Sequence, residues 1–260
     1  MNCLVFDIET VPDVELGRRL YNLAGLSDDE IMKCMFTLRR QKTGSEFLPH
    51  DQHRIVAISC VLRANDILKV WSLGSLQSSE QELVERFFDG IERYSPNLVS
   101  WNGSGFDLPV LHYRALKYGV RAARYWETGG EDQTFRYNNY LSRYHWRHVD
   151  VMDVLSGYQA RAKAGLEAIA TMIGLPGKLG FSGDKVADAY LAGELPRIRQ
   201  YCETDVINTY LVYLRFELMR GNLMPERYAE EVERMKTLLR AGTSAEPHFT
   251  EYLRAWEAQT

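Results

Sequence analysis

The sequence LVFDIET, at residues 4–10, is the most informative part of this chain. Apolar side chains recur at every second position, which is the period of a half-buried strand. Asp7 and Glu9 therefore point to the same side of that strand. Two adjacent carboxylates repel each other and raise each other's pKa unless a cation lies between them. Carboxylate oxygens favour Mg²⁺ or Mn²⁺ over Zn²⁺. The alternative is an edge strand whose two acids face water.

The composition is that of an ordinary globular protein, with 45% hydrophobic and 25% charged residues. We expect a single domain over residues 1–260, which is long enough to bury a sizeable core. No apolar run approaches the roughly 20 residues of a membrane span, and no signal peptide is recognisable, so we expect no membrane partner. A cytoplasmic location fits four scattered cysteines without a C-x-x-C pair: Cys3, Cys34, Cys60 and Cys202.

The net charge of −4 does not by itself indicate a nucleic-acid-binding protein. The segment at residues 111–149 differs, because it carries seven arginines and lysines against three acids, interleaved with nine tyrosines, tryptophans and phenylalanines. Cations and aromatic rings together suit single-stranded nucleic acid, whose phosphates take the charge and whose bases stack on the rings. The alternative is a solvated basic surface with the aromatic residues in the core.

The periodicity along the chain predicts an α/β fold, with a mixed five-stranded sheet flanked by helices. Further strands are expected at 54–63, 67–73, 97–101 and 148–151. Helices are expected within 13–41, at 78–94, from 107, and at about 165–173, 184–192, 194–219, 225–240 and 248–258. Residues 13–53 thus form a helical insertion after the first strand, in which Ser27 begins a capping box, and residues 220–260 form a helical C-terminal extension.

Two later motifs carry further acids. In NGSGFD, at residues 102–107, a strand ends, two glycines turn the chain and Asp107 begins a helix. An aspartate at that position could equally cap the helix. In YCETD, at residues 201–205, Tyr201 and Asp205 lie one above the other on a helix beside its apolar stripe. The alternative for Asp205 is a solvated surface acid.

These three motifs, in this order on a strand, a loop–helix junction and a late helix, resemble the exonuclease motifs of the DEDD superfamily. The tyrosine in the last motif resembles the DEDDy form, which occurs in the proofreading domains of family B DNA polymerases. The sequence YCETDVINTYLVYLR, at residues 201–215, is similar to bacterial stand-alone proteins described as predicted 3′-5′ exonucleases. The resemblance covers residues 4 to about 219. It implies a ribonuclease H-like fold, with Asp7, Glu9, Asp107 and Asp205 as ligands of two Mg²⁺ or Mn²⁺ ions and Tyr201 as the fifth catalytic residue.

The resemblance implies hydrolysis of phosphodiester bonds from the 3′ end of single-stranded or frayed DNA, with release of nucleoside 5′-monophosphates. Two ions roughly 4 Å apart would activate water and neutralise the leaving oxygen. Tyr201, at an ordinary pKa near 10, would align the water rather than deprotonate it. Four residues are expected to contact the substrate: Thr10, Asn102, Phe106 and Lys185. A solvated role is the alternative for Lys185.

Sibling enzymes place a histidine five residues before the last aspartate, and His148 and Asp153 have that spacing. We prefer Tyr201 with Asp205, because His148 falls in an expected strand. Asp150 is then expected to support the site, and Asp153 to cap the next helical turn. Since little sequence follows Asp205, we expect no attached polymerase. The same reaction on RNA, and a non-catalytic nucleic-acid-binding scaffold, are the alternative functions.

Overall fold

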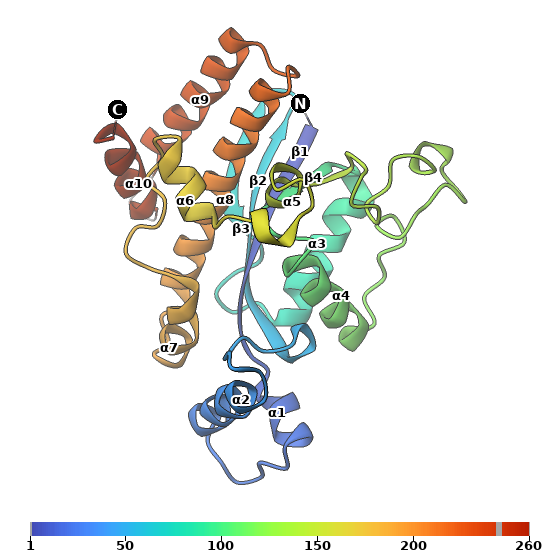
Figure 1. The fold of residues 1–260 in the computed structure, drawn as a ribbon, viewed down its shortest axis with the longest axis vertical. Coiled ribbons are helices and arrows are strands. Elements are labelled where there is room, and N and C mark those ends of the chain that lie inside the picture. The colour runs from blue at the N-terminus through green and yellow to red at the C-terminus, as the bar shows by residue number, and fades with distance from the viewer. Residues whose placement is uncertain (1, 243–245, 260) are drawn as a thin grey trace.

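The computed structural model describes residues 2–242 and 246–259, and its centre is a five-stranded sheet (Figure 1). The strands are β1 (Asn2–Pro12), β2 (His53–Ala64), β3 (Ile67–Ser72), β4 (Asn97–Ser100) and β5 (His148–Asp150). Their order is β3-β2-β1-β4-β5, in which β1, β2 and β3 are antiparallel neighbours while β4 and β5 run parallel to β1. This confirms the predicted α/β class and the mixed five-stranded sheet.

Helices cover both faces of the sheet (Figure 1). The α-helices are α1 (Val14–Leu20), α2 (Asp28–Thr43), α3 (Glu80–Tyr94), α4 (Asp107–Tyr118), α5 (Val151–Leu155), α6 (Leu166–Met172), α7 (Val186–Leu191), α8 (Leu195–Met219), α9 (Pro225–Arg240) and α10 (Pro247–Glu257). Short 3₁₀ turns are η1 (His50–Gln52), η2 (Gln133–Phe135), η3 (Ala160–Ala162) and η4 (Gly183–Lys185). No helix in the described ranges is long and apolar enough to cross a membrane.

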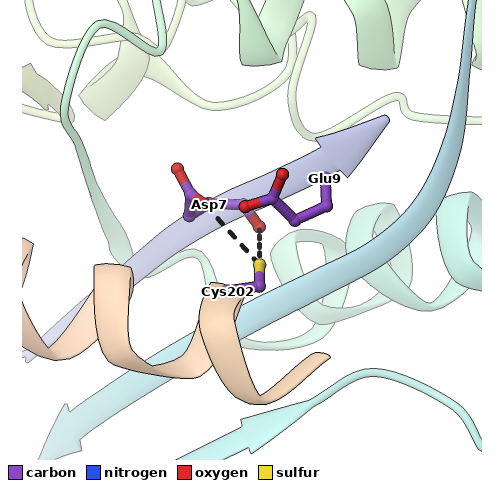
Figure 2. Close-up of side chains that lie close together, drawn as sticks. All are labelled: Asp7, Glu9 and Cys202. Carbon is purple, nitrogen blue, oxygen red and sulfur yellow. Dashed lines mark hydrogen bonds between the residues drawn. The ribbon is translucent and has the colours of Figure 1, made fainter. Parts of the chain in front are cut away.

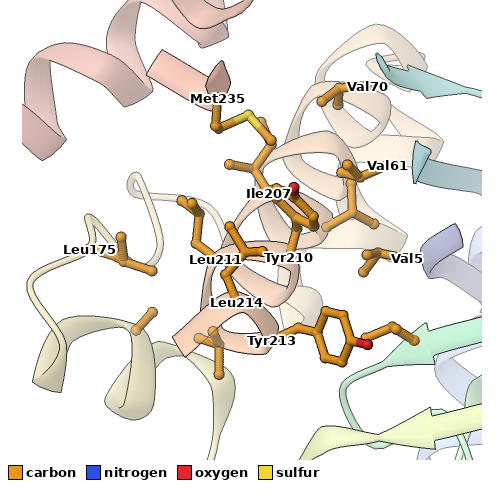
Figure 3. Packing of buried hydrophobic residues seen from close by; sticks show 14 of the residues in the cluster. Val5, Val61, Val70, Leu175, Ile207, Tyr210, Leu211, Tyr213, Leu214 and Met235 are labelled. Atoms are coloured by element: carbon orange, nitrogen blue, oxygen red, sulfur yellow. The ribbon is translucent and has the colours of Figure 1, made fainter. Parts of the chain in front are cut away.

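The alternation in β1 assigns its side chains to two different cores. Leu4, Phe6 and Ile8 pack against α3 and α4, with the Phe6 and Phe87 rings 5.0 Å apart. Cys3 and Val5 belong to the opposite core, which α8, α9 and α10 complete (Figure 3). Because Asp7 and Glu9 continue the second series, both carboxylates face α8.

The sequence-based prediction of a half-buried first strand was wrong. β1 lies in the middle of the sheet, and its Val5 and Phe6 side chains, on opposite faces, are both buried. The edge-strand alternative for Asp7 and Glu9 is therefore excluded. Pairing with β2 is regular up to Glu9 and shifts by one residue before Thr10, so a bulge follows the second acid directly.

Other differences from the expected elements are local. Ser27 forms the predicted capping box with Glu30 at the start of α2. The α5 helix was not predicted, and it begins at Val151, which was expected to end a strand. Asp150 caps α5 by accepting a hydrogen bond from the backbone of Asp153, so the prediction that Asp153 is the cap was wrong.

Candidate active site

Asp7 and Glu9 lie side by side on β1 and face the Cys202 thiol of α8 (Figure 2). One ligand atom from each of these three side chains lies within 4.8 Å of the other two. The Cys202 Sγ donates to the Asp7 backbone oxygen at 3.5 Å and to its carboxylate Oδ2 at 3.6 Å. Cys202 is a buried thiol, and its position fixes α8 against the carboxylate pair.

Asp107 reaches the same place from the other side of β1. It is the first residue of α4, and its Oδ1 accepts a hydrogen bond from the Ile8 backbone N–H at 3.1 Å. Ile8 lies between Asp7 and Glu9 in the sequence, so this bond joins α4 to the acidic strand. The helix cap is Phe106, with no side-chain capping bond, which shows that Asp107 does not serve as an ordinary cap.

The loop before Asp107 has a tightly determined path. The Asp150 carboxylate accepts hydrogen bonds from the backbone N–H groups of Asn102 and Ser104, both at 2.9 Å. A Cβ atom at Gly103 would lie 2.2 Å from the Ser100 hydroxyl, so only glycine fits there. Asp150 therefore supports the loop that delivers Asp107, in line with the supporting position expected for it.

Tyr201 and Asp205 face the acids from one side of α8, and both are buried. Burial raises the pKa of the Tyr201 phenol far above its usual value, and the negative charges of Asp205 and Glu9 raise it further. The phenol therefore stays protonated and can donate a hydrogen bond to Asp205, which lowers the pKa of that carboxyl. The Tyr201 ring packs on Phe181 at 5.0 Å.

The pKa values of the four carboxyl groups are all raised, which favours their protonated forms. Burial raises the pKa of Asp7 and of Glu9 well above the usual range, and the neighbouring carboxylates add to both shifts. Burial raises the pKa of Asp107 to about 7, although backbone hydrogen bonds lower it, and the pKa of Asp205 to about 6. Buried, mutually repelling oxygen ligands are stabilised by a divalent cation, so this donor set fits a hard metal ion.

Lys178 supplies positive charge here, although the sequence analysis did not single it out. Its charge lowers the pKa of both Glu9 and Asp205. The loop before it is held to α8, because the Asn208 amide donates to the Gly177 carbonyl at 3.1 Å. The only sequence signal was a lysine directly after the Gly-Leu-Pro-Gly turn.

The predicted substrate contacts lie on several elements. Asn102 adopts a left-handed backbone conformation, with φ of 63°, in the loop before Asp107. The Thr10 hydroxyl pairs with the His53 Nδ1 at 2.8 Å. Lys185 is exposed and donates to the Gly180 carbonyl at 3.3 Å. Phe106 packs with the rings of residues 47, 50 and 53, in the segment that we expect to be a helical insertion.

The insertion therefore reaches the site. Its Phe47 ring lies 5.5 Å from the Phe106 ring, and the His53 ring lies 5.0 Å from it. The His50 Nε2 pairs with the Gly105 carbonyl at 2.8 Å. We define Phe47, His50, His53 and Phe106 as the aromatic cluster.

The competing pair is placed differently. The His148 Nε2 pairs with the Ser100 hydroxyl at 2.8 Å inside the sheet, and burial lowers the pKa of His148 to about 4. Asp153 forms ion pairs with Arg143 at 2.6 Å and Lys163 at 3.0 Å. These contacts use both side chains in packing, whereas Tyr201 and Asp205 face the acids of β1.

The family model described as "Predicted 3'-5' exonuclease related to the exonuclease domain of PolB" matches residues 45–256. The chain belongs to this family. The match includes Asp107, Tyr201 and Asp205, while Asp7 and Glu9 precede its first residue. Members of this exonuclease family are predicted hydrolases, and exonuclease domains of this kind generally use divalent metal ions.

Three DNA polymerases are similar to this chain over part of their own length. The chain is 54% identical over 39 residues to DNA polymerase 1 of Sulfurisphaera ohwakuensis and 48% identical over 42 residues to DNA polymerase 1 of Saccharolobus solfataricus. These matches cover 15% and 16% of the chain but only 4% and 5% of the polymerases. The family B DNA polymerase structure from Pyrobaculum calidifontis is similar over 96% of the chain and 27% of the polymerase, with TM-score 0.49 and 16% identity.

Proposed function

We propose that this protein is a metal-dependent 3′-5′ exonuclease that acts on single-stranded DNA and releases nucleoside 5′-monophosphates. The convergence of Asp107 and Asp205 on the acidic pair of β1 is the observation that carries the proposal. Buried carboxylates from three distant parts of a chain repel one another, so their assembly is explained best by a bound cation. A scaffold protein would gain nothing from this arrangement.

The metal ligands in this proposal are Asp7, Glu9, Asp107 and Asp205. Two Mg²⁺ or Mn²⁺ ions bound there would acidify a water molecule and neutralise charge on the phosphate and on the leaving 3′-oxygen. The raised pKa values of Asp107 and Asp205 mean that metal binding must displace protons near neutral pH. Cys202 stays outside the ligand set, because Mg²⁺ and Mn²⁺ prefer oxygen ligands to a soft sulfur.

Tyr201 has a positioning role in the reaction. Its protonated phenol donates to Asp205, and its oxygen keeps lone pairs that can accept a hydrogen bond from the attacking water. Water adds to the phosphorus, the bond to the 3′-oxygen breaks, and that oxygen leaves as the 3′-hydroxyl of the shortened strand. Lys178 adds positive charge beside Glu9 and Asp205, which favours approach of a phosphate.

The terminal nucleotide is proposed to bind at the loop before Asp107. Asn102 would hydrogen-bond to it, and Phe106 would stack on its base, with Thr10 and Lys185 as further contacts. Phe47 extends the ring surface, since it packs on Phe106 and is 55% exposed. The helical insertion would thereby form one wall of the terminal-nucleotide site.

The test uses 5′-labelled single strands of DNA and of RNA, incubated with Mn²⁺, with Mg²⁺ or with EDTA. We expect metal-dependent shortening of the labelled strand from its 3′ end, with faster cleavage of DNA, and release of unlabelled nucleoside 5′-monophosphates that chromatography would detect. Asp205→Asn should abolish cleavage, whereas Asp66→Asn, at an exposed turn, should leave it unchanged. Faster cleavage of RNA would assign an exoribonuclease instead, and tight binding without cleavage would assign a scaffold.

A further inference from the structure

A pocket of about 580 Å³ lies beyond the loop that carries Asp107, on the side formed by α4 and the long connection to β5. Ser104 and Gly105 belong to its wall and precede Asp107 by three and two residues. The pocket therefore begins where the proposed terminal-nucleotide site ends. Its volume falls within the range of about 300–1,000 Å³ that is common for small-molecule and cofactor sites.

Three aromatic rings line this pocket: Tyr125, Trp126 and Tyr140. Trp126 is 52% exposed, although its ring lies 4.9 Å from the ring of His112 and 5.3 Å from the ring of Tyr125. Tyr125 in turn stacks on buried Tyr140, with ring planes only 6° apart. Tyr140 is fixed by its hydroxyl, which donates to the Pro96 carbonyl at 2.7 Å. The indole is thus held at the pocket by a rigid support while its surface stays available.

Two cations also line this pocket. Arg143 and Lys163 both line the pocket and share one acid, Asp153, so this group of three has a formal charge of +1. The Arg143 side chain remains 46% exposed while it holds that ion pair. An exposed guanidinium and a half-exposed indole in one pocket match the two parts of a nucleotide, its phosphate and its base.

We propose that this pocket is a second nucleotide subsite, in which Trp126 stacks on a base and Arg143 with Lys163 contacts a backbone phosphate. The inference rests on the proposed exonuclease function. A 3′-terminal nucleotide has no neighbour on its 3′ side, so an adjoining subsite must hold a nucleotide on the 5′ side of the scissile phosphate. Trp126, Arg143 and Lys163 would then give the enzyme its preference for a single strand over a mononucleotide ester.

The experiment compares two substrates in Mn²⁺: a ten-nucleotide DNA single strand and the p-nitrophenyl ester of thymidine 5′-monophosphate, which carries neither a second base nor a second phosphate. Trp126→Ala should raise KM for the oligonucleotide by about tenfold or more, the loss expected when a stacked base loses its ring. Kinetics with the ester should stay within about twofold. Arg143→Gln should raise the oligonucleotide KM and weaken its dependence on salt, because one phosphate contact is lost.

Two variants exclude a purely structural effect. Trp126→Phe keeps an aromatic surface and should restore most of the affinity. Trp146→Ala removes a tryptophan of similar exposure, 46%, that does not line the pocket, and should leave the oligonucleotide KM unchanged. An unchanged KM in Trp126→Ala, or equal losses in Trp126→Ala and Trp146→Ala, would overturn the inference. Failure of the wild-type protein to hydrolyse either substrate would instead overturn the proposed function.

Discussion

The Asp7 side chain is a proposed metal ligand, and its burial among other acids destabilises the metal-free folded protein. Its carboxyl lies among Glu9, Asp107 and Asp205, and their charges together with burial raise its pKa. Without a cation, ionisation of this group opposes the folded state. The same residue is thus expected to be necessary for turnover and unfavourable for metal-free stability.

We predict that Asp7→Asn lowers kcat at least about a hundredfold. Loss of a residue that only hydrogen-bonds to a metal ligand can already cost that much, and Asp7 is itself a proposed ligand. The melting temperature in EDTA should rise, because one repelling charge is removed without loss of volume. Circular dichroism melts and single-strand cleavage assays would measure both effects. Asp66→Asn, with its side chain in an exposed turn, serves as the control and should change neither. A lower melting temperature for Asp7→Asn in EDTA would contradict this account.

Tyr201 permits a more selective test. Tyr201→Phe retains the ring that packs on Phe181 and removes only the hydroxyl that bonds to Asp205. We predict a loss of about a hundredfold in kcat with little change in KM, because in the proposed mechanism the hydroxyl aligns water and does not bind the strand. Tyr228→Phe, on α9, also removes one hydroxyl, which accepts a hydrogen bond from Arg215 of α8, and should leave kcat unchanged. A change confined to KM would assign Tyr201 to substrate binding.

Among the elements, α4 depends on a buried ion network at its second turn. Arg114 is 2% exposed and pairs with Asp13, at the end of β1, and with Glu80 of α3. Burial alone would raise the pKa of Asp13, but hydrogen bonds from Arg114 and Leu16 lower it below its usual value. The network therefore fixes α4, and with it Asp107, to the end of the acidic strand.

This finding divides the basic and aromatic segment at residues 111–149 between the two roles considered for it. Arg114, Tyr125, Phe135 and Tyr140 are buried and belong to the packing. Trp126 is half exposed and Tyr137 is largely exposed, so they remain available to a ligand. Periodicity could not separate these groups, because the segment has only one short 3₁₀ turn between α4 and β5.

We predict that Arg114→Leu destabilises the protein by about 3–5 kcal/mol, because two buried carboxylates lose their cation. Urea unfolding monitored by tryptophan fluorescence would measure the change. Lys117→Leu, whose side chain is 36% exposed and pairs with the same Asp13, should cost at most about 1 kcal/mol. Loss of nucleic-acid affinity at unchanged stability would instead assign Arg114 to the substrate.

For the molecule as a whole, we expect the free energy of unfolding to depend on pH through the acidic site. In EDTA the folded pKa of Asp107, about 7, exceeds the usual value of 3.8, so the folded state holds this proton longer than the unfolded state. Its contribution therefore lowers stability as pH rises from about 4 to about 7, by at most about 1.4 kcal/mol per pH unit, and is constant above that. The buried histidines His53, His112 and His148, whose pKa values burial lowers to about 4, act in the opposite direction.

A difference measurement removes the histidine contribution. We predict that Asp107→Asn, in EDTA, becomes increasingly more stable than wild type between pH 4 and 7, and that the difference then levels off. Saturating Mn²⁺ should reverse the order at pH 7 and above, because the metal binds the deprotonated wild-type ligands. Chemical unfolding at several pH values would measure both curves. A difference that is independent of pH would show that Asp107 ionises normally in the folded protein.

Much of the fold and of the candidate site could be predicted from local patterns. Alternation placed Asp7 and Glu9 on one face of a strand, and a stripe of apolar residues placed Tyr201 and Asp205 on one helix. These features depend on backbone geometry over a few residues, which a short sequence determines. The order of the three motifs then indicated the family to which the chain belongs.

The tertiary structure alone decided which distant groups meet. The bond from Ile8 to Asp107, the Lys178 charge near Glu9, and the contact of Phe47 with Phe106 join residues that no local period relates. The local sequence also could not show which charged residues are buried. Arg114 and an exposed arginine look alike in the sequence, but only Arg114 pairs with two buried acids. Side-chain environment is set by packing across the whole chain, and charge, protonation and access follow from that environment.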